Sequence, residues 1–257
     1  DFGLSNLQQK YPFIKIIRAL KNGGFSYGNN IGIKASSGDL ILLLNPDTYV
    51  EDNAIEKLIK RIESDDELFF IGPQLLYPDK SNQSYFLPKT YLNLWRLFCE
   101  RFYLYRLFPR SLFFNSYYKT FMDYNKECFV EQISGAAFLF RKKSIETIGL
   151  LDENYFMYFE ESDYCLKAIK YGYTMLYYPE SKIIHIGGLG NQSNWNRSTK
   201  TFSKSLKYYF IKNFGYMSCF AAIVLQAMGA LVRTLLLLVA RDEKYKYHYY
   251  SFKNIIL

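Results

Sequence analysis

The side chains best suited to chemistry in this sequence are carboxylates and an imidazole that stand where predicted strands and helices begin or end. Asp47 follows the apolar run 40–44 within Asn45-Pro46-Asp47, and His185 closes a later apolar stretch, PESKIIHIGG. A carboxylate oxygen and an imidazole nitrogen can together hold a divalent cation and leave positions open for a diphosphate and water. This pair predicts a metal site, although an ordinary Asn-Pro-Asp turn and a structural histidine would look the same.

A second group of carboxylates lies in the stretch YFEESDYC. Glu160, Glu161 and Asp163 fall in the first turn of a helix predicted over about 160–171 and ended by Gly172. The helix macrodipole favours carboxylates there, so capping alone can account for them. The alternative is that one of them is a general base whose pKa is raised by the neighbouring acids.

Predicted strands and helices alternate along the chain, which favours a parallel α/β sheet. The run 40–44 is short and apolar and ends at Pro46, as expected of a central strand buried on both faces. Asp47 would then lie at the carboxyl end of that strand, where open α/β sheets bind ligands. Further strands are expected at 13–17, 69–72, 173–178 and 182–186, helices at 29–35 and 52–63, and a loop entering a strand at 133–140.

Composition limits the partners. The 257 residues suffice for one large domain, or a domain with an appendage, and a net charge of +8 indicates an anionic partner. An aromatic content of 19% favours surfaces that meet lipid headgroups or sugars, and the sequence carries no motif of a nucleic-acid-binding module. The cysteines lack the paired spacing of a zinc or disulfide framework and are expected in the core; they are Cys99, Cys128, Cys165 and Cys219.

Two segments suggest contact with a membrane. Residues 91–121 interleave aromatic residues and leucines with arginines, which suits either an interfacial amphipathic segment, broken near Pro109, or a core helix with a solvated face. Residues 216–240 are nearly all apolar and long enough to span a bilayer, but Gln226 and Arg233 favour a helix lying in the interface. The basic residues on either side suit the anionic lipid of a cytoplasmic leaflet.

Four segments in order resemble glycosyltransferase family 2, and within it bacterial rhamnosyltransferase-like enzymes: NGGFSYGNNIGI, LLLNPDT, ISGAAFLFRKKSIETIGLLDENYFMYFEESDYCLKAIKYGY and YPESKIIHIGG. The resemblance covers about residues 10–190. It implies a GT-A, Rossmann-like fold, a mostly parallel α/β sheet with flanking helices, in a domain over 1–200 with an amphipathic insert at 91–121. A membrane-associated helical region would follow at 201–257. The family's first strand and its base- and ribose-binding acids are expected upstream of Asp1, which implies a truncated N-terminus.

The resemblance also implies roles for single residues. Asp47 would hold Mg²⁺ or Mn²⁺ against the donor diphosphate, with His185 as a late metal or diphosphate ligand. Glu161 stands where the family usually has an aspartate as its general base, and this longer side chain leaves Glu160 and Asp163 as alternatives. The other implied site residues are Asn22, Gly24, Phe25, Asn30 and Asn45 for the donor, and Gly135 and Ala136 for the acceptor.

These implications predict an inverting, metal-dependent glycosyltransferase at the cytoplasmic face of the cell membrane. It would move a sugar such as rhamnose from a nucleotide-diphosphate donor to a lipid-linked or polysaccharide acceptor in cell-surface glycan biosynthesis. A single base opposite a metal-held leaving group means one in-line displacement, which inverts the sugar carbon. The alternatives are a sugar-phosphate nucleotidyltransferase, whose basic Gly-rich triphosphate loop is not found, and a non-catalytic membrane- or glycan-binding fragment.

Overall fold

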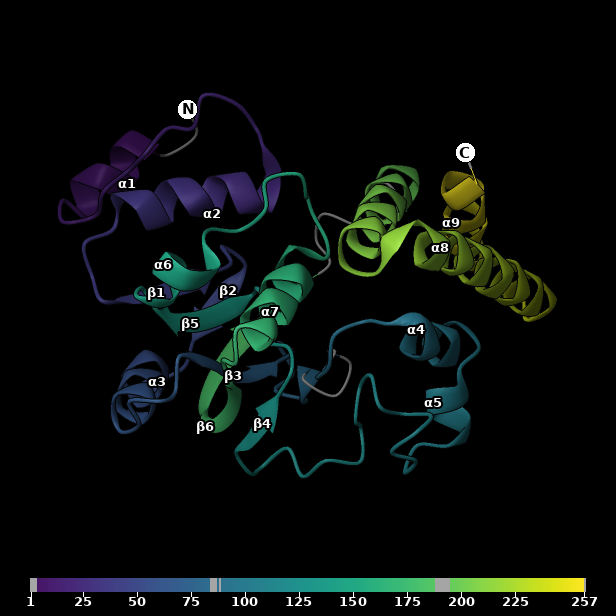
Figure 1. Cartoon of the computed structure of the whole chain (residues 1–257). Helices are drawn as coiled ribbons and strands as arrows, with labels where there is room; N and C mark the ends of the chain where they lie inside the picture. Colours follow the sequence, from purple (N-terminus) through teal and green to yellow (C-terminus); the bar gives the residue numbers. More distant parts are fainter. Residues whose placement is uncertain (1–3, 84–86, 88, 188–194, 257) are drawn as a thin grey trace.

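The computed structural model describes residues 4–83, 87, 89–187 and 195–256. Figure 1 shows a sheet with helices on both faces and a group of long helices at one side. The strands run in the order β1-β5-β3-β6-β2, and β4 also pairs with β6. Their bounds are β1 Leu40–Leu44, β2 Thr48–Val50, β3 Phe70–Leu76, β4 Cys128–Val130, β5 Ala137–Arg141 and β6 Met175–His185.

The sheet is mixed, which corrects the expectation of a mostly parallel one. Among the described strands only β3 and β6 pair in parallel, while β1 with β5, β3 with β5, β2 with β6 and β4 with β6 are antiparallel. The apolar pattern of a strand with both faces covered is the same whichever way its neighbours run. Sequence periodicity therefore indicated the strands without their directions.

Strand β1 forms where the apolar run predicted it, with both faces covered. Ile41 and Leu43 join the hydrophobic cluster beneath the helices of one face, and Leu40 and Leu42 pack against the cluster on the other. Its position differs from the expected central one, because β1 stands at the end of the strand order and pairs with β5 alone among the described strands.

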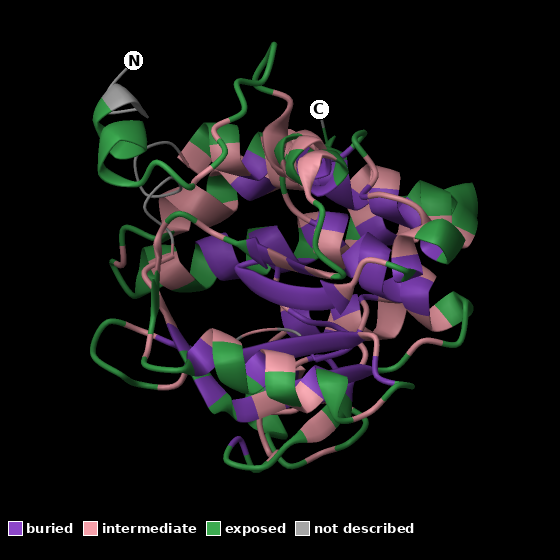
Figure 2. Cartoon of the chain, turned by 90° about the vertical axis from the view of Figure 1, so that its left-hand side faces the viewer, coloured by how far each residue is buried: buried purple, intermediate pink, exposed green. Residues whose placement is uncertain are grey.

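Helices cover the two faces of the sheet unequally, as Figures 1 and 2 show. Helix α3 (Ala54–Glu63) packs Leu58 and Ile62 onto one face. The other face carries α2 (Gly24–Ala35), α6 (Ser144–Ile148) and α7 (Glu160–Lys170), which bury Ile33, Ile148 and Cys165 against β1, β3 and β5. Figure 2 shows the strands as the most completely buried part of the layered body.

Two other sequence expectations need correction. Residues 13–17 form no strand, and Phe13 there is 83% exposed, because a β-branched run becomes a strand only where a neighbour pairs with it. The two late strands expected at 173–178 and 182–186 are the single strand β6, whose register against β3 shifts between Pro73 and Gln74. Short α1 (Leu4–Lys10) precedes the loop that contains Phe13.

The C-terminal helices form a second hydrophobic core with α4 and α7. Helix α8 (Trp195–Val239) kinks at Gly215, whose φ is 84°, and α9 (Tyr245–Ile256) packs back against it. Within 91–121, only α4 (Leu94–Arg101) and α5 (Leu104–Leu107) are helical; they separate at Tyr103 in the left-handed region, before Pro109. The expected domain boundary near residue 200 falls inside α8, and by length and apolar composition α8 could cross a membrane.

Candidate active site

Asp47 and His185 are brought together by the pairing of β2 with β6. The chain leaves β1 at Leu44, turns through Asn45 and begins β2 at Thr48, which lies opposite His185 in the antiparallel register. The amide of Ile186 donates to the carbonyl of Asp47 at 3.0 Å, and Asp47 Oδ1 lies 3.5 Å from His185 Nε2. Two residues far apart in the sequence thus present an oxygen and a nitrogen ligand to one point.

A third side chain, Gln83, orients the imidazole. His185 Nδ1 lies 2.9 Å from Gln83 Oε1, and Gln83 Nε2 donates to the carbonyl of His185 at 3.1 Å. Burial lowers the pKa of His185, with Asp47 opposing the shift, so neutral imidazole is favoured. With its Nδ1–H donated to Gln83, neutral His185 turns the Nε2 lone pair toward Asp47.

This donor set fits a divalent cation shared with a ligand. Within the described parts of the chain, no group of three His, Cys, Asp or Glu residues could enclose a metal ion. A cation at Asp47 and His185 would therefore take its remaining ligands from a diphosphate and water, and small, hard cations commonly bind in this way. Nothing in the sequence around Gln83 signalled its contact with the histidine.

The paired glutamates at the start of α7 lie in an unusual environment. Tyr158 and Phe159, the two residues before Glu160, both have positive φ, at 72° and 70°. Consecutive non-glycine residues in this region store strain that is typical of functional sites. The Glu160 side chain is buried, its Oε2 has no hydrogen-bond partner, and burial followed by the Glu161 charge raises its pKa. Burial also raises the pKa of Glu161.

Asp163 differs from the two glutamates because its carboxylate is fully partnered. Its Oδ2 accepts from Lys212 Nζ at 2.6 Å, and its Oδ1 accepts from Asn213 Nδ2 at 2.8 Å and Tyr155 Oη at 3.2 Å. Lys212 also donates to Asp152 Oδ2 at 2.7 Å. This network fastens α7 to α8 and leaves Asp163 little capacity to accept a substrate proton.

The expected donor and acceptor segments meet at Gly135. A Cβ added to Gly135 would lie 3.1 Å from the Phe25 ring and 3.7 Å from Glu161 Cβ, so a larger residue there would require the Phe25 ring to shift slightly. Gly24 takes a φ of +84° against the chain at Phe156, and a Cβ there would overlap the Phe156 carbonyl. Gly24 thus permits a backbone approach that a larger residue would block.

The loop before β5 also connects this region to Asp47. The carbonyl of Ala136 accepts from the amide of Asn45 at 3.0 Å, and the amide of Ala136 points to Ser134 Oγ at 3.3 Å. Residues 133–136 thus contact the metal-site turn on one side and Glu161 on the other. The structure places the predicted acceptor residues Gly135 and Ala136 between Glu161 and the turn that carries Asp47.

Two of the three asparagines expected at the donor, Asn22 and Asn30, have side chains with partners inside the fold. Asn22 Oδ1 accepts from the amide of Gly24 at 3.3 Å, near the start of α2. Asn30 is buried; it donates to the Leu151 carbonyl and to Glu153 Oε1, and its Oδ1 accepts from the Leu151 amide. The bonds of Asn30 position α2 against the loop before α7, and direct contact with a donor remains a prediction for Asn22, Asn30 and Asn45.

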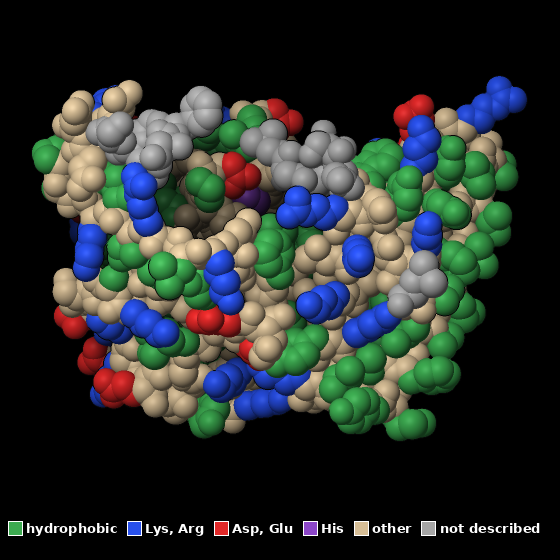
Figure 3. Space-filling view, turned by 90° about the horizontal axis from the view of Figure 1, so that it is seen from above, with side chains coloured by type: hydrophobic (Ala, Val, Ile, Leu, Met, Phe, Trp, Pro, Cys, Tyr) green, Lys and Arg blue, Asp and Glu red, His purple; other side chains and the backbone are tan. Residues whose placement is uncertain are grey.

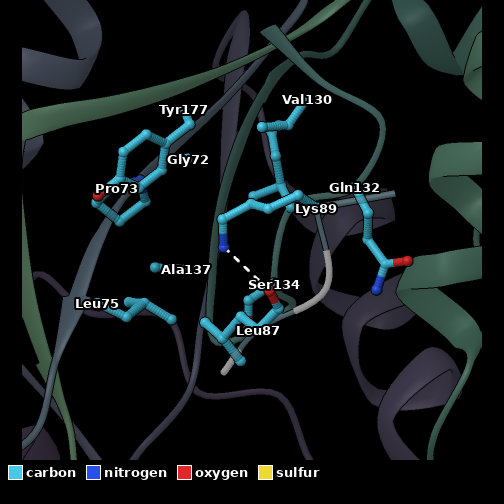
Figure 4. A pocket seen from close by; sticks show the side chains of 11 residues that line it. Gly72, Pro73, Leu75, Leu87, Lys89, Val130, Gln132, Ser134, Ala137 and Tyr177 are labelled. Carbon is cyan, nitrogen blue, oxygen red and sulfur yellow. Dashed lines mark hydrogen bonds between the residues drawn. The ribbon is translucent and has the colours of Figure 1, made fainter. Parts of the chain in front are cut away.

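A hollow opens on the face shown in Figure 3, with histidine and acidic side chains visible in its wall. A separate small cavity lies behind residues 132–134 (Figure 4). It holds about 20 Å³, room for roughly one water molecule, so it is too small for a sugar. Lys89 points into it and donates to the Leu87 carbonyl at 3.1 Å, and burial lowers the pKa of Lys89 to about 7.

The sheet and its flanking helices have the GT-A fold of glycosyltransferases. Residues 3–149 match the family described as Glycosyl transferase family 2, and the chain belongs to that family. The chain is 24% identical to Rhamnosyltransferase WbbL of Escherichia coli (strain K12) over 202 residues, 76% of this chain and 70% of that protein. It is also 24% identical to the N-acetylglucosaminyl-diphospho-decaprenol L-rhamnosyltransferase of Mycobacterium tuberculosis (strain CDC 1551 / Oshkosh) over 190 residues, 69% of this chain and 60% of that relative.

Two solved structures share the fold at low sequence identity. GalNAc-T7 with UDP, GalNAc and Mn²⁺ superposes with a TM-score of 0.50 at 14% identity, covering 81% of this chain and 40% of that one. The mannosyltransferase PcManGT from Pyrobaculum calidifontis, in complex with GDP-Man and Mn²⁺, superposes with a TM-score of 0.54 at 8% identity, covering 98% of this chain and 73% of that one. The expected GT-A fold and rhamnosyltransferase-like family are confirmed.

Proposed function

We propose that this glycosyltransferase is metal-dependent and inverting, and that it moves a sugar such as rhamnose from a nucleotide-diphosphate donor to a lipid-linked or polysaccharide acceptor. Both curated relatives are rhamnosyltransferases by name, and one name specifies a diphospho-decaprenol acceptor. The observation that carries the mechanism is the Asp47–His185 pair at 3.5 Å, joined through one loop to Glu161.

Asp47 and His185 would hold Mg²⁺ or Mn²⁺ at the end of β1, with Gln83 keeping the imidazole in the ligating tautomer. When bound, the cation supplies a Lewis acid that stabilises the leaving nucleoside diphosphate. The chain's own part is to fix two ligands at this turn and to leave the remaining positions free for donor oxygens.

Glu161 is the proposed general base. The acceptor hydroxyl gives its proton to the carboxylate while its oxygen bonds to the anomeric carbon, and the bond from that carbon to the diphosphate oxygen breaks. Burial raises the pKa of Glu161, and burial followed by the Glu161 charge raises the pKa of Glu160, so both carboxyls hold a proton more tightly than an exposed carboxyl does. Asp163 is proposed as the anchor of the helix that carries the base.

The proposed location is the cytoplasmic face of the cell membrane. Basic residues on both sides of the apolar part of α8 suit anionic lipid there, and a lipid-linked acceptor costs about 0.8 kcal/mol for each CH₂ drawn into water. An enzyme that acts on such a substrate gains by binding at the bilayer surface.

The decisive experiment mixes the chain with Mg²⁺ or Mn²⁺, nucleotide-diphosphate sugars that include a rhamnose donor, and a prenyl-diphosphate-linked acceptor. Release of nucleoside diphosphate with glycosylated lipid, lost on chelation and in Asp47→Ala, is the expected result. A nucleotidyltransferase would release pyrophosphate from a nucleoside triphosphate, and a non-catalytic fragment would release neither. Unchanged turnover in Asp47→Ala would remove the metal assignment.

A further inference from the structure

The half of α8 that follows the kink, residues 216–239, has two unlike faces. Its buried face consists of Cys219, Ala222, Gln226, Gly229, Ala230, Arg233 and Thr234. Its exposed face is a stripe at helical spacing, formed by Met217, Phe220, Val224, Met228, Leu231, Leu235 and Leu238. These stripe residues are each 40% exposed or more, and Met217 is 82% exposed.

The buried face packs against helices α4 and α9 of the same chain. Arg233 donates to the backbone carbonyls of Glu100 and Arg101 on α4 and lies 3.2 Å from Glu100 Oε1. A Cβ on Gly229 would come within 2.6 Å of Arg101 Cβ, so the two helices cross there in close contact. On the α9 side, Gln226 Nε2 donates to Ser251 Oγ at 2.8 Å. Gln226 and Arg233, which interrupt the apolar sequence, thus both bind other helices of the fold.

The exposed stripe has the chemistry of a lipid-facing surface. Arg233 is the single charged residue between 216 and 239, and it is buried, so the stripe carries no charge over roughly 30 Å. Contiguous exposed apolar surface of this length marks an interaction site. Figure 3 shows hydrophobic side chains along this side of the molecule, with Lys and Arg between them and the hollow. The basic residues that flank the stripe in sequence are Lys204, Lys207, Lys212, Arg241, Lys244 and Lys246.

We propose that residues 216–239 lie in the plane of an anionic membrane surface, with the exposed stripe in the lipid, and that they do not cross the bilayer. The segment alone is long enough to span, at roughly 36 Å. Its packing partners are not: α9 has 12 residues, about 18 Å of helix against a hydrocarbon core of about 30 Å. A spanning α8 would either lose these partners or draw them into hydrocarbon.

The charged residues of α4 and α9 also favour the in-plane arrangement over the spanning one. Helix α4 brings Arg96, Glu100 and Arg101, and α9 brings Lys246 and Lys253. In a spanning arrangement these groups would enter the bilayer core, where each charge is costly. In the in-plane arrangement they stay on the protein side of α8 or at the headgroups, while the stripe alone is submerged.

The kink at Gly215 connects this surface to the catalytic helix. Lys212 and Asn213, just before the kink, bind Asp163 on α7, and the lipid-facing stripe begins just after it, at Met217. Figure 1 shows the two parts of α8 diverging at this point. The inference rests on the proposed function only in naming a lipid-linked acceptor. The in-plane binding of residues 216–239 to a membrane does not depend on the proposed sugar transfer.

The experiment uses the full chain with vesicles of phosphatidylcholine and phosphatidylglycerol. The double variant Leu231→Asp/Leu235→Asp should bind at least about tenfold more weakly, because burying each leucine favours binding by about that factor. The control is Phe13→Asp/Leu20→Asp, which makes the same change at two exposed residues elsewhere and should bind like the unmodified chain. Equal loss in both variants, or no binding by the unmodified chain, would refute the proposal and leave the stripe to a second copy of the chain.

The depth of residues 216–239 in the bilayer distinguishes an in-plane helix from a spanning one. Met217→Trp, Met228→Trp and Leu238→Trp are each quenched by lipids brominated at known depths, with the unmodified chain as background. The proposal expects one shallow depth at all three positions. A maximum at Met228, with Met217 and Leu238 near opposite headgroups, would show a spanning helix and overturn it. Vesicle binding without sugar transfer would instead refute the proposed function and leave this inference standing.

Discussion

Glu160 and Asp163 lie one turn apart at the start of α7, and both side chains are nearly fully buried, at 5% and 3% exposure. Asp163 faces α8, whose Lys212 and Asn213 donate to its oxygens, and Tyr155 in the loop before α7 also donates to it. Glu160 has an oxygen without a partner and a neighbouring carboxyl that raises its pKa further. The two carboxylates are thus about equally buried, but only Asp163 has donors that compensate its buried charge. A compensated carboxylate holds structure, and an uncompensated one is available to exchange a proton.

The largest expected effect tests whether the base lies on the uncompensated side. Glu161→Gln keeps the size and hydrogen bonding of the side chain but cannot accept a proton, so kcat should fall by about 10²- to 10⁴-fold. Donor affinity, measured by titration calorimetry, should hardly change. Asp163→Asn should lower thermal stability, and it should lower kcat per folded molecule by less than Glu161→Gln does. If the two variants exchange these outcomes, the base has been assigned to the wrong residue of this turn.

The pH dependence of the rate follows from the same contrast. Burial raises the pKa of both Glu160 and Glu161, and the Glu161 charge raises that of Glu160 further. A base acts only when deprotonated. Activity should therefore fall by about tenfold per pH unit below the raised pKa, and it should level off above it. The measurement is kcat against pH at saturating metal and donor. A rate that stays flat down to the ordinary range of a carboxyl group, near 4.5, would contradict the raised pKa.

An intermediate effect is expected on the compensated side. Lys212 joins Asp163 to Asp152, and its side chain is 33% exposed, so solvent screens part of the interaction. Lys212→Met should lower the free energy of unfolding by about 2 kcal/mol, because it leaves Asp163 buried with one partner fewer. Urea unfolding measures this loss, and Lys204→Met, an exposed lysine of the same helix, should change stability little. In the Asp163→Asn background, Lys212→Met should cost clearly less, since coupled pairs are not additive.

How much of this could be predicted from the sequence differs between the parts of the site. The run 40–44 and the helix ended by Gly172 appeared as expected, because apolar periodicity and a glycine stop are local signals. Asp47 and His185 were each identifiable as residues that follow apolar segments. Their meeting depends on β2 pairing with β6, which is a long-range contact.

The remaining features depend on contacts that no local pattern encodes. Gln83 lies in a loop, yet it orients His185 from 102 positions away. Lys212 and Asn213 look like polar positions of an amphipathic helix, and only the packing of α8 on α7 shows that they hold Asp163. For the same reason the sequence left three acids open as the base. Adjacent positions on a helix face different neighbours, and only the fold supplies them.

The smallest expected effect concerns stability at Glu160. In the unfolded chain its carboxyl ionises near the ordinary value of 4.5, whereas burial raises the pKa in the fold. A raised pKa means that the folded state binds the proton more tightly. Its contribution to stability is therefore full below pH 4.5 and is lost as pH rises toward the folded pKa. Glu160→Gln removes the ionisation, so the variant should match the original chain near pH 4.5 and exceed it by at least about 1 kcal/mol at pH 8, where the unfolded carboxyl has released its proton and the folded one, with its pKa raised to about 9, still holds it. Denaturant unfolding at the two pH values measures the difference, and Glu146→Gln, at an exposed position on α6, serves as the matched control with no such crossover. If Glu160→Gln instead destabilises the chain at pH 8, as Asp163→Asn is expected to do, the Glu160 carboxylate has a compensating partner after all, and the two acids of this turn do not differ in the way proposed.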